Sequence, residues 1–168
     1  MKYACIKSND IVDVKDGIAV SFWVQGCPHR CEGCHNPSTW DFNGGKEKDI
    51  DEIIEELYED IISNGIKRDF SILGGEPLAE QNRADVCYII NNLRFKVPNL
   101  KIYLWTGYTK EALDKMNDTY IKSILSNIDI LIDGPFILSQ RDITLPLRGS
   151  CNQNIYQKNE QGEFVKLT

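Results

Sequence analysis

Four short runs of β-branched and aromatic residues recur along the chain, and each is followed within two residues by a glycine. Runs of this length, bounded by turn-forming residues, are typical of strands buried in a protein core. The runs cover residues 18–24, 69–73, 101–105 and 129–133. A last strand, with a hairpin at Gln161-Gly162, is predicted within residues 154–168.

Helical periodicity fills the segments between these strands. In residues 49–64 the apolar positions follow the i, i+3, i+4, i+7 spacing of an amphipathic helix, acidic residues fill the outer face, and Gly65 supplies a stop. A second pattern, over residues 84–93, predicts a helix that ends before Pro98. Helical sequence then returns and runs to about Asn127. Strands and helices therefore alternate.

This alternation predicts an α/β fold with a mostly parallel sheet and right-handed crossovers. From the usual relation between length and domain number, we expect one domain over residues 1–168. A closed eight-stranded barrel needs about 250 residues. The sequence therefore predicts an incomplete, open β/α barrel.

Three loops with candidate chemistry, at Cys27, Gly74 and Asp133, each follow a predicted strand. Because the carboxyl ends of parallel strands lie at one edge of a sheet, we expect these loops to share one rim. Asp133 is a candidate for a cofactor or partner contact. It is equally typical of a turn-forming Asp before Gly134-Pro135.

Composition and charge narrow the classes of partner. The formal net charge is -6 and no long basic run is present, so a nucleic-acid partner is not expected. No stretch of roughly 18 apolar residues suggests a membrane span. The N-terminus lacks the apolar core and cleavage site of a secretory signal, so we expect a cytoplasmic protein.

The distribution of the cysteines indicates a metal site. Three of the six fall within eight residues, whereas the others are scattered. In an intracellular chain such clustering is typical of metal binding rather than of disulfides. The scattered cysteines are interpreted as small buried hydrophobes. They are Cys5, Cys87 and Cys151.

The clustered cysteines have the spacing C-x3-C-x2-C, with no fourth cysteine nearby. A cubane iron-sulfur cluster is commonly held by four cysteines, so three would leave one iron with an open coordination position. Gly26 and Gly33 permit close backbone approach to such a cluster. The predicted metal ligands are Cys27, Cys31 and Cys34.

Two other kinds of site compete with this one. A structural zinc site could use the three cysteines with His29 or His35 as its fourth ligand. Zinc modules usually pair ligands from two separate knuckles, so the tight spacing favours a cluster, and each histidine taken singly is interpreted as a loop residue. A passive electron carrier should ligate its cluster fully, which three cysteines do not achieve.

A second motif, Gly74-Gly75-Glu76-Pro77, follows the predicted strand at 69–73. It would present unpaired backbone groups at the rim. Taken alone, it is more typical of a glycine turn with Pro77 at the first position of a helix. The motif indicates a function only in combination with the cysteine motif.

Together the two motifs resemble the radical S-adenosylmethionine superfamily, in which the cysteine loop holds a 4Fe-4S cluster and the Gly-Gly-Glu-Pro segment contacts the methionyl amino group. Gly33 departs from that pattern, because an aromatic residue often precedes the last cysteine. Within the superfamily, the sequence is similar to the activating proteins of anaerobic ribonucleoside-triphosphate reductases. The stretches that carry this similarity are 17–42, 73–78, 133–136 and 148–153.

The resemblance implies two cofactors, a 4Fe-4S cluster and S-adenosylmethionine. It implies reductive cleavage to a 5′-deoxyadenosyl radical, which takes hydrogen from a glycine of the large reductase subunit, with a flavodoxin-type protein as electron donor. Alternatives are an activase for another glycyl radical enzyme or another small radical enzyme. Arg148 and Asn152 are interpreted as local backbone caps, with a partner interface as the alternative. The expected cofactor-binding residues are Gly33, Cys34, His35, Gly74, Gly75, Glu76 and Asp133.

Overall fold

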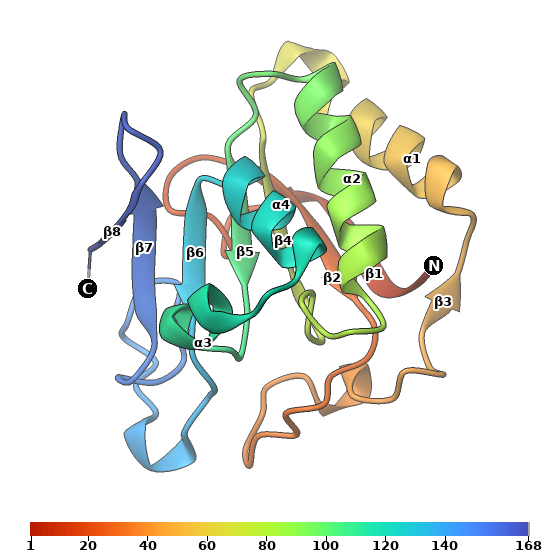
Figure 1. The fold of residues 1–168 in the computed structure, drawn as a ribbon. Helices are drawn as coiled ribbons and strands as arrows, with labels where there is room; N and C mark the ends of the chain where they lie inside the picture. Colours follow the sequence, from red (N-terminus) through yellow and green to blue (C-terminus); the bar gives the residue numbers. More distant parts are fainter. Residues whose placement is uncertain (168) are drawn as a thin grey trace.

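The computed structural model describes residues 1–167 as an α/β structure built on one eight-stranded sheet (Figure 1). The strand order is β3-β1-β2-β4-β5-β6-β7-β8, so β3 and β8 are the two edges. The strands are β1 Lys2–Asp10, β2 Ala19–Val24, β3 Lys46–Glu47, β4 Asp69–Gly74, β5 Ile102–Trp105, β6 Ile130–Asp133, β7 Asn154–Lys158 and β8 Phe164–Lys166.

The prediction of a mostly parallel sheet is wrong. Within the described residues, β2, β4, β5 and β6 pair in parallel, giving three parallel pairings. Four pairings, which join β1 to β2 and β3 and β7 to β6 and β8, are antiparallel. The strand-helix alternation specifies only the central crossovers, whereas hairpin-like additions at both ends pair antiparallel. The pairing establishes an open sheet, and it does not establish a barrel.

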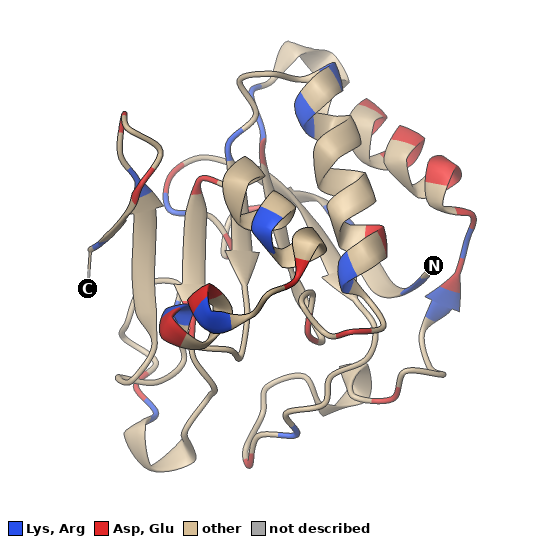
Figure 2. Cartoon of the chain, in the orientation of Figure 1, with Lys and Arg blue, Asp and Glu red and all other residues tan. Residues whose placement is uncertain are grey.

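The helices gather on one face of this sheet (Figure 1). They are α1 Ile50–Ile62, α2 Arg83–Lys96, α3 Lys110–Lys115 and α4 Thr119–Asn127. Single 3-10 turns occur at Pro37–Thr39, Ser63–Gly65 and Leu138–Gln140. The outer face of α1 is acidic, as its sequence predicts (Figure 2). None of the helices within residues 1–167 combines the length and apolar character required to cross a bilayer.

Alternate residues of the central strands face two different environments. Phe22, Ile72 and Leu104 pack under the helices in the main core. Their neighbours on the opposite face include Tyr103 and Trp105, which belong to a smaller cluster under the loops at 11–17 and 141–149. Because side chains alternate along a strand, this second face is presented away from the helices. The candidate site lies at the edge of that face.

Candidate metal and cofactor site

The loop that carries the three clustered cysteines begins directly after β2. Gly26 N donates to Thr39 O at 2.8 Å and Cys27 N donates to Trp40 O at 3.1 Å, which closes the base of the loop. At Gly26, φ is +97° and an added Cβ would lie 2.0 Å from the Phe42 ring. Only glycine satisfies both conditions.

The three cysteines line one pocket at the carboxyl ends of the parallel strands. The cavity has a volume of about 180 Å³. All six cysteines of the chain are free, and Cys27, Cys31 and Cys34 are half-buried. The remaining walls come from the loops after β4, β5 and β6. Those wall residues are His29, Asn36, Leu73, Gly74, Gly75, Glu76, Trp105, Thr106, Gly107, Gly134, Phe136 and Gln153.

Across residues 1–167, no three His, Cys, Asp or Glu side chains converge closely enough to share one metal ion. A single zinc needs all its ligands within about 2.3 Å of one point. The thiolates of an iron-sulfur cubane bind separate irons and need not converge in this way. The donor set, three free thiols around one pocket, therefore fits a cluster.

The Gly74-Gly75 segment forms another wall of this pocket, against the base of the cysteine loop. Gly75 N donates to Val24 O at 2.9 Å, and Glu76 N donates to Gly26 O at 2.8 Å. A Cβ at Gly75 would lie 2.4 Å from Gly26 O, and one at Gly74 would lie 2.8 Å from Val24 N and O. Both glycines are thus required by the close approach of two backbones, and they leave this wall of the pocket without side chains.

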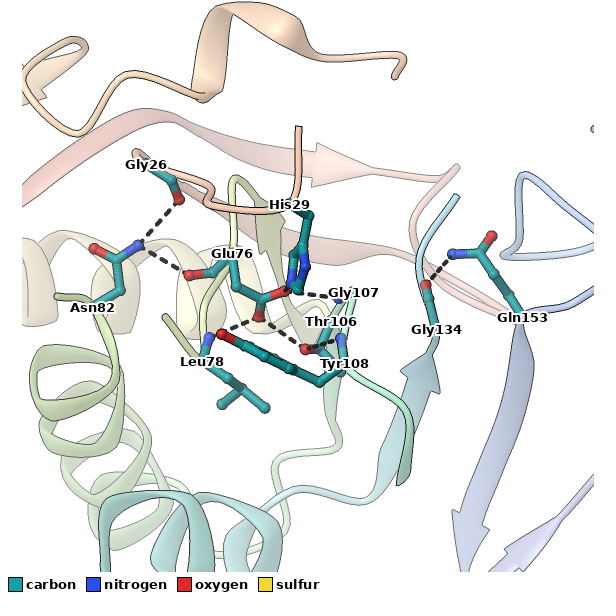
Figure 3. A network of polar contacts seen from close by, with 10 residues as sticks. All are labelled: Gly26, His29, Glu76, Leu78, Asn82, Thr106, Gly107, Tyr108, Gly134 and Gln153. Atoms are coloured by element: carbon teal, nitrogen blue, oxygen red, sulfur yellow. Dashed lines mark hydrogen bonds and ion pairs between the residues drawn. The ribbon is translucent and has the colours of Figure 1, made fainter. Parts of the chain in front are cut away.

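Glu76 is buried at the back of the pocket, with a relative exposure of 1%. Its Oε1 accepts from Leu78 N at 2.9 Å and from the Thr106 hydroxyl at 2.8 Å. Its Oε2 accepts from Gly107 N at 2.7 Å and lies 2.8 Å from His29 Nε2 (Figure 3). A carboxylate offers about four acceptor positions, and four donors surround this one.

Burial raises the pKa of the Cys27 thiol, and the negative charge of Glu76 adds to the increase, while backbone N–H groups of His29 and Arg30 oppose it. A raised pKa favours the neutral thiol. A metal that binds the sulfur stabilises the thiolate instead. Cluster binding would therefore release a proton at Cys27.

Comparison with known proteins agrees with this donor set. The family described as a 4Fe-4S single cluster domain matches residues 15–156. The anaerobic ribonucleoside-triphosphate reductase-activating protein of Vibrio cholerae is 36% identical over 142 residues, which cover 84% of this chain and 88% of that protein. The proteins of the same name from Pasteurella multocida and Haemophilus influenzae are 36% and 34% identical, each over 94% of this chain and 98% of the relative.

This chain belongs to the anaerobic ribonucleoside-triphosphate reductase-activating protein family.

In this member of the reductase-activating family, the expectation that the three loops share a rim is confirmed, because Cys27, Gly74 and Gly134 line the same pocket. Asp133 itself is fully buried and does not line this pocket. Its carboxylate accepts from Lys110 N at 2.6 Å and from Asn154 N and Nδ2 at 3.1 and 2.9 Å. These bonds tie the start of α3 to β7. The predicted contact of Asp133 with a cofactor or partner stays a prediction.

Two other residues singled out in the sequence, His35 and Arg148, line a second, larger hollow on the sheet face away from the helices, with a volume of about 390 Å³. Cys34 lines it as well, so it adjoins the cysteine pocket. Gly33 has φ +73°, and an added Cβ would lie 2.7 Å from Leu138 Cδ1. A larger side chain before the last cysteine would therefore collide with Leu138.

The interpretations of Arg148, Asn152 and the three scattered cysteines are confirmed only for some of these residues. Arg148 Nη1 donates to Gln153 O at 3.1 Å, which caps local backbone, whereas Asn152 Nδ2 donates to Pro135 O at 2.7 Å, in the loop after β6. Cys87 is buried in the core and Cys5 is half-buried. Cys151 is exposed, so its interpretation as a buried hydrophobe is wrong.

Sequence reasoning missed the residues that enclose Glu76. From the sequence, His29 is interpreted as a loop residue, and Thr106 and Gly107 are not singled out. Their position after a central parallel strand was the available signal, because such strand ends collect functional groups. The contact between His29 and Glu76, which are 47 positions apart, has no local sequence signature.

Proposed function

We propose that this chain holds a 4Fe-4S cluster on Cys27, Cys31 and Cys34 and generates a glycyl radical on the large subunit of an anaerobic ribonucleoside-triphosphate reductase. The observation that supports this most is the pocket that is lined by three free thiols and by the backbone of Gly74 and Gly75. Three thiols leave one iron without a protein ligand. The relatives named above are reductase-activating proteins.

When bound there, the cluster would supply the electron that cleaves S-adenosylmethionine into methionine and a 5′-deoxyadenosyl radical, which takes a hydrogen atom from the glycine. The protein's own task is to bind and orient the reactants and to exclude water. Gly74 and Gly75 leave room for a cofactor against backbone carbonyls. His35 and Gly33 flank Cys34 and are proposed to contact the cofactor from the other side.

A protein substrate needs an open approach to the pocket. The hollow lined by Trp23, Leu147 and Arg148 adjoins the cysteine pocket on the sheet face that the helices leave free. At its border Val12 is 75% exposed. An extended segment of the reductase could enter along this mostly apolar hollow, which supports a protein substrate.

A flavodoxin-type protein is proposed as the electron donor, because reduction of a sulfonium requires a cluster potential near the low end of the range of about -700 to +450 mV. A donor of this kind carries electrons at low potential. The chain is further proposed to act in the cytoplasm.

The test is anaerobic incubation of the reconstituted protein with a reductant, S-adenosylmethionine and the reductase large subunit, followed by electron paramagnetic resonance. We expect a glycyl doublet with the wild type and with Cys151→Ser, and none with Cys31→Ser. Cofactor cleavage without a doublet would contradict the choice of substrate. Absence of 5′-deoxyadenosine would contradict the radical reaction itself.

A further inference from the structure

His29 makes an unusual contact for a residue in a metal-binding loop. Among the side chains between Cys27 and Cys34, all of which the structure describes, that of His29 is the one that hydrogen bonds to a different loop. Its Nε2 lies 2.8 Å from Glu76 Oε2. A carboxylate only accepts hydrogen bonds, so Nε2 is the donor. The bond joins the cysteine loop to the Gly74–Glu76 segment across the pocket.

The His29 ring packs closely against Tyr108 and Gly107. Tyr108 meets it edge to face, with ring centroids 4.6 Å apart and an interplanar angle of 72°. On the other side an added Cβ at Gly107 would lie 2.5 Å from Cδ2 of the ring. The histidine side chain is 19% exposed, while that of Glu76 is 1% exposed. The ring is therefore largely shielded from water at the point where it bonds.

Glu76 also accepts hydrogen bonds from its own loop and from one further loop. Its other donors are Leu78 N, in the segment that leads to α2, and Thr106 and Gly107, in the segment between β5 and α3 (Figure 3). The bond to His29 is therefore anchored to a group that cannot turn away without leaving buried donors unsatisfied.

The backbone contacts hold the cysteine loop only at its base. Cys27 N bonds to Trp40 O, and Glu76 N bonds to Gly26 O, both at or before the first cysteine. Between Cys27 and Cys34 the residues are half-buried or exposed, and Arg30 has a left-handed φ of +48°. Beyond its base, the loop thus depends on His29 for its polar attachment to the rest of the rim.

We propose that His29 is a positioning residue whose hydrogen bond to Glu76 holds the cysteine loop at a fixed distance from the Gly74–Glu76 wall. We call this bond the His29–Glu76 clasp. The first consequence concerns the chain alone: without the clasp the loop becomes mobile. The second rests on the proposed function: a mobile loop binds S-adenosylmethionine more weakly, because the cluster and the glycine wall no longer keep one separation.

Two substitutions separate the hydrogen bond from the packing of the ring. His29→Phe keeps a ring against Tyr108 and removes the donor, whereas His29→Gln keeps an N–H donor at similar reach. His29→Leu is a second donorless variant should the phenylalanine ring disturb the fold. Glu32→Ala is the matched control, because Glu32 is exposed on the same loop and makes no hydrogen bond within residues 1–167.

The first measurement is amide hydrogen exchange of residues 27–36 in the metal-free protein. A hydrogen bond to a charged group stabilises by an amount that corresponds to roughly tenfold or more in exchange rate. We expect that acceleration in the donorless variants, and near wild-type exchange in His29→Gln and Glu32→Ala. Equal exchange in all variants, or equal acceleration in His29→Phe and His29→Gln, would overturn the clasp.

The second measurement is the affinity for S-adenosylmethionine at matched iron content, read from the spectral change of the cluster. The clasp predicts about tenfold weaker binding in His29→Phe and recovery in His29→Gln. Wild-type affinity in His29→Phe would overturn the positioning role. Failure of the wild type to bind would instead contradict the proposed function, and the exchange measurement would still decide the clasp.

Discussion

Gly75 shows how one missing side chain controls the site. Its Cα lies so close to the preceding loop that a Cβ would approach Gly26 O to 2.4 Å, and both partners are backbone. Neither can rotate away as a side chain would. A methyl group at this position must therefore push the cysteine loop and the glycine wall apart.

We predict that Gly75→Ala lowers the free energy of unfolding by about 3 kcal/mol, the upper end of the usual cost of overpacking, because both clashing partners are backbone. Gly162→Ala is the control, because Gly162 has φ +79° but nothing within 4 Å of an added Cβ. Its cost should be only the about 1–2 kcal/mol of a left-handed residue. Urea unfolding of the metal-free proteins measures the free energy of unfolding of both variants. An equal decrease in the two variants would contradict the steric explanation for Gly75.

Asp13, in the hollow beside the cysteine pocket, makes stability depend on pH. Burial, together with the nearby charge of Asp10, raises the pKa of Asp13 from 3.8 to about 7. The folded state therefore binds a proton more tightly than the unfolded state. The stabilisation is complete below about pH 4 and is lost as pH rises through about 7.

We predict that Asp13→Asn gains stability relative to the wild type between pH 5 and pH 8, because the amide cannot ionise. Asp142→Asn is the control. Bonds from Thr144 lower the pKa of Asp142 below 3.8, so its titration lies outside this interval. Urea unfolding at pH 5 and at pH 8 measures the stability of each variant relative to the wild type. If the stability difference between Asp13→Asn and the wild type is the same at both pH values, the raised pKa of Asp13 is refuted.

At the scale of elements, Asn82 joins the start of α2 to the rim. Its Nδ2 donates to Gln25 O and to Glu76 O, both at 3.0 Å, and it is 3.4 Å from Gly26 O. The side chain is buried, so these bonds are made away from water. One amide thus connects the loops after β2 and β4 to a helix.

Asn82→Ala is predicted to lower the free energy of unfolding by about 2–3 kcal/mol, because it removes buried hydrogen bonds and takes from Gln25 O its side-chain donor. Asn92→Ala removes one amide bond, to Tyr88 O on the exposed side of the same helix, and should cost less than about 1 kcal/mol. Thermal melts of the two variants compare them directly. A smaller loss for Asn82→Ala than for Asn92→Ala would contradict this account.

Most elements could be predicted because their side-chain periods are local. The helix expected over 49–64 is α1, and the strand and hairpin expected within 154–168 are β7 and β8. The helical stretch up to Asn127 proved to be two helices, with a break at 116–118. β1 was missed, because only residues 3–6 of it are apolar and most of the strand is half-buried or exposed.

At the scale of the whole molecule, the helices cover one face of an open sheet and leave the other for the site. The sequence could predict which loops share a rim, because parallel strands end at one edge. It could not predict the antiparallel additions at both ends or the bond between His29 and Glu76. Those depend on long-range pairing rather than on a local pattern.

The most direct test of the central claim is the metal content of protein assembled without oxygen. We predict close to four irons with matching sulfide per chain in the wild type and in Cys151→Ser, since the matched family is a single 4Fe-4S cluster domain. Each of Cys27→Ser, Cys31→Ser and Cys34→Ser should lose most of both. Zinc in place of iron, or a cluster that survives loss of all three thiols, would contradict the account.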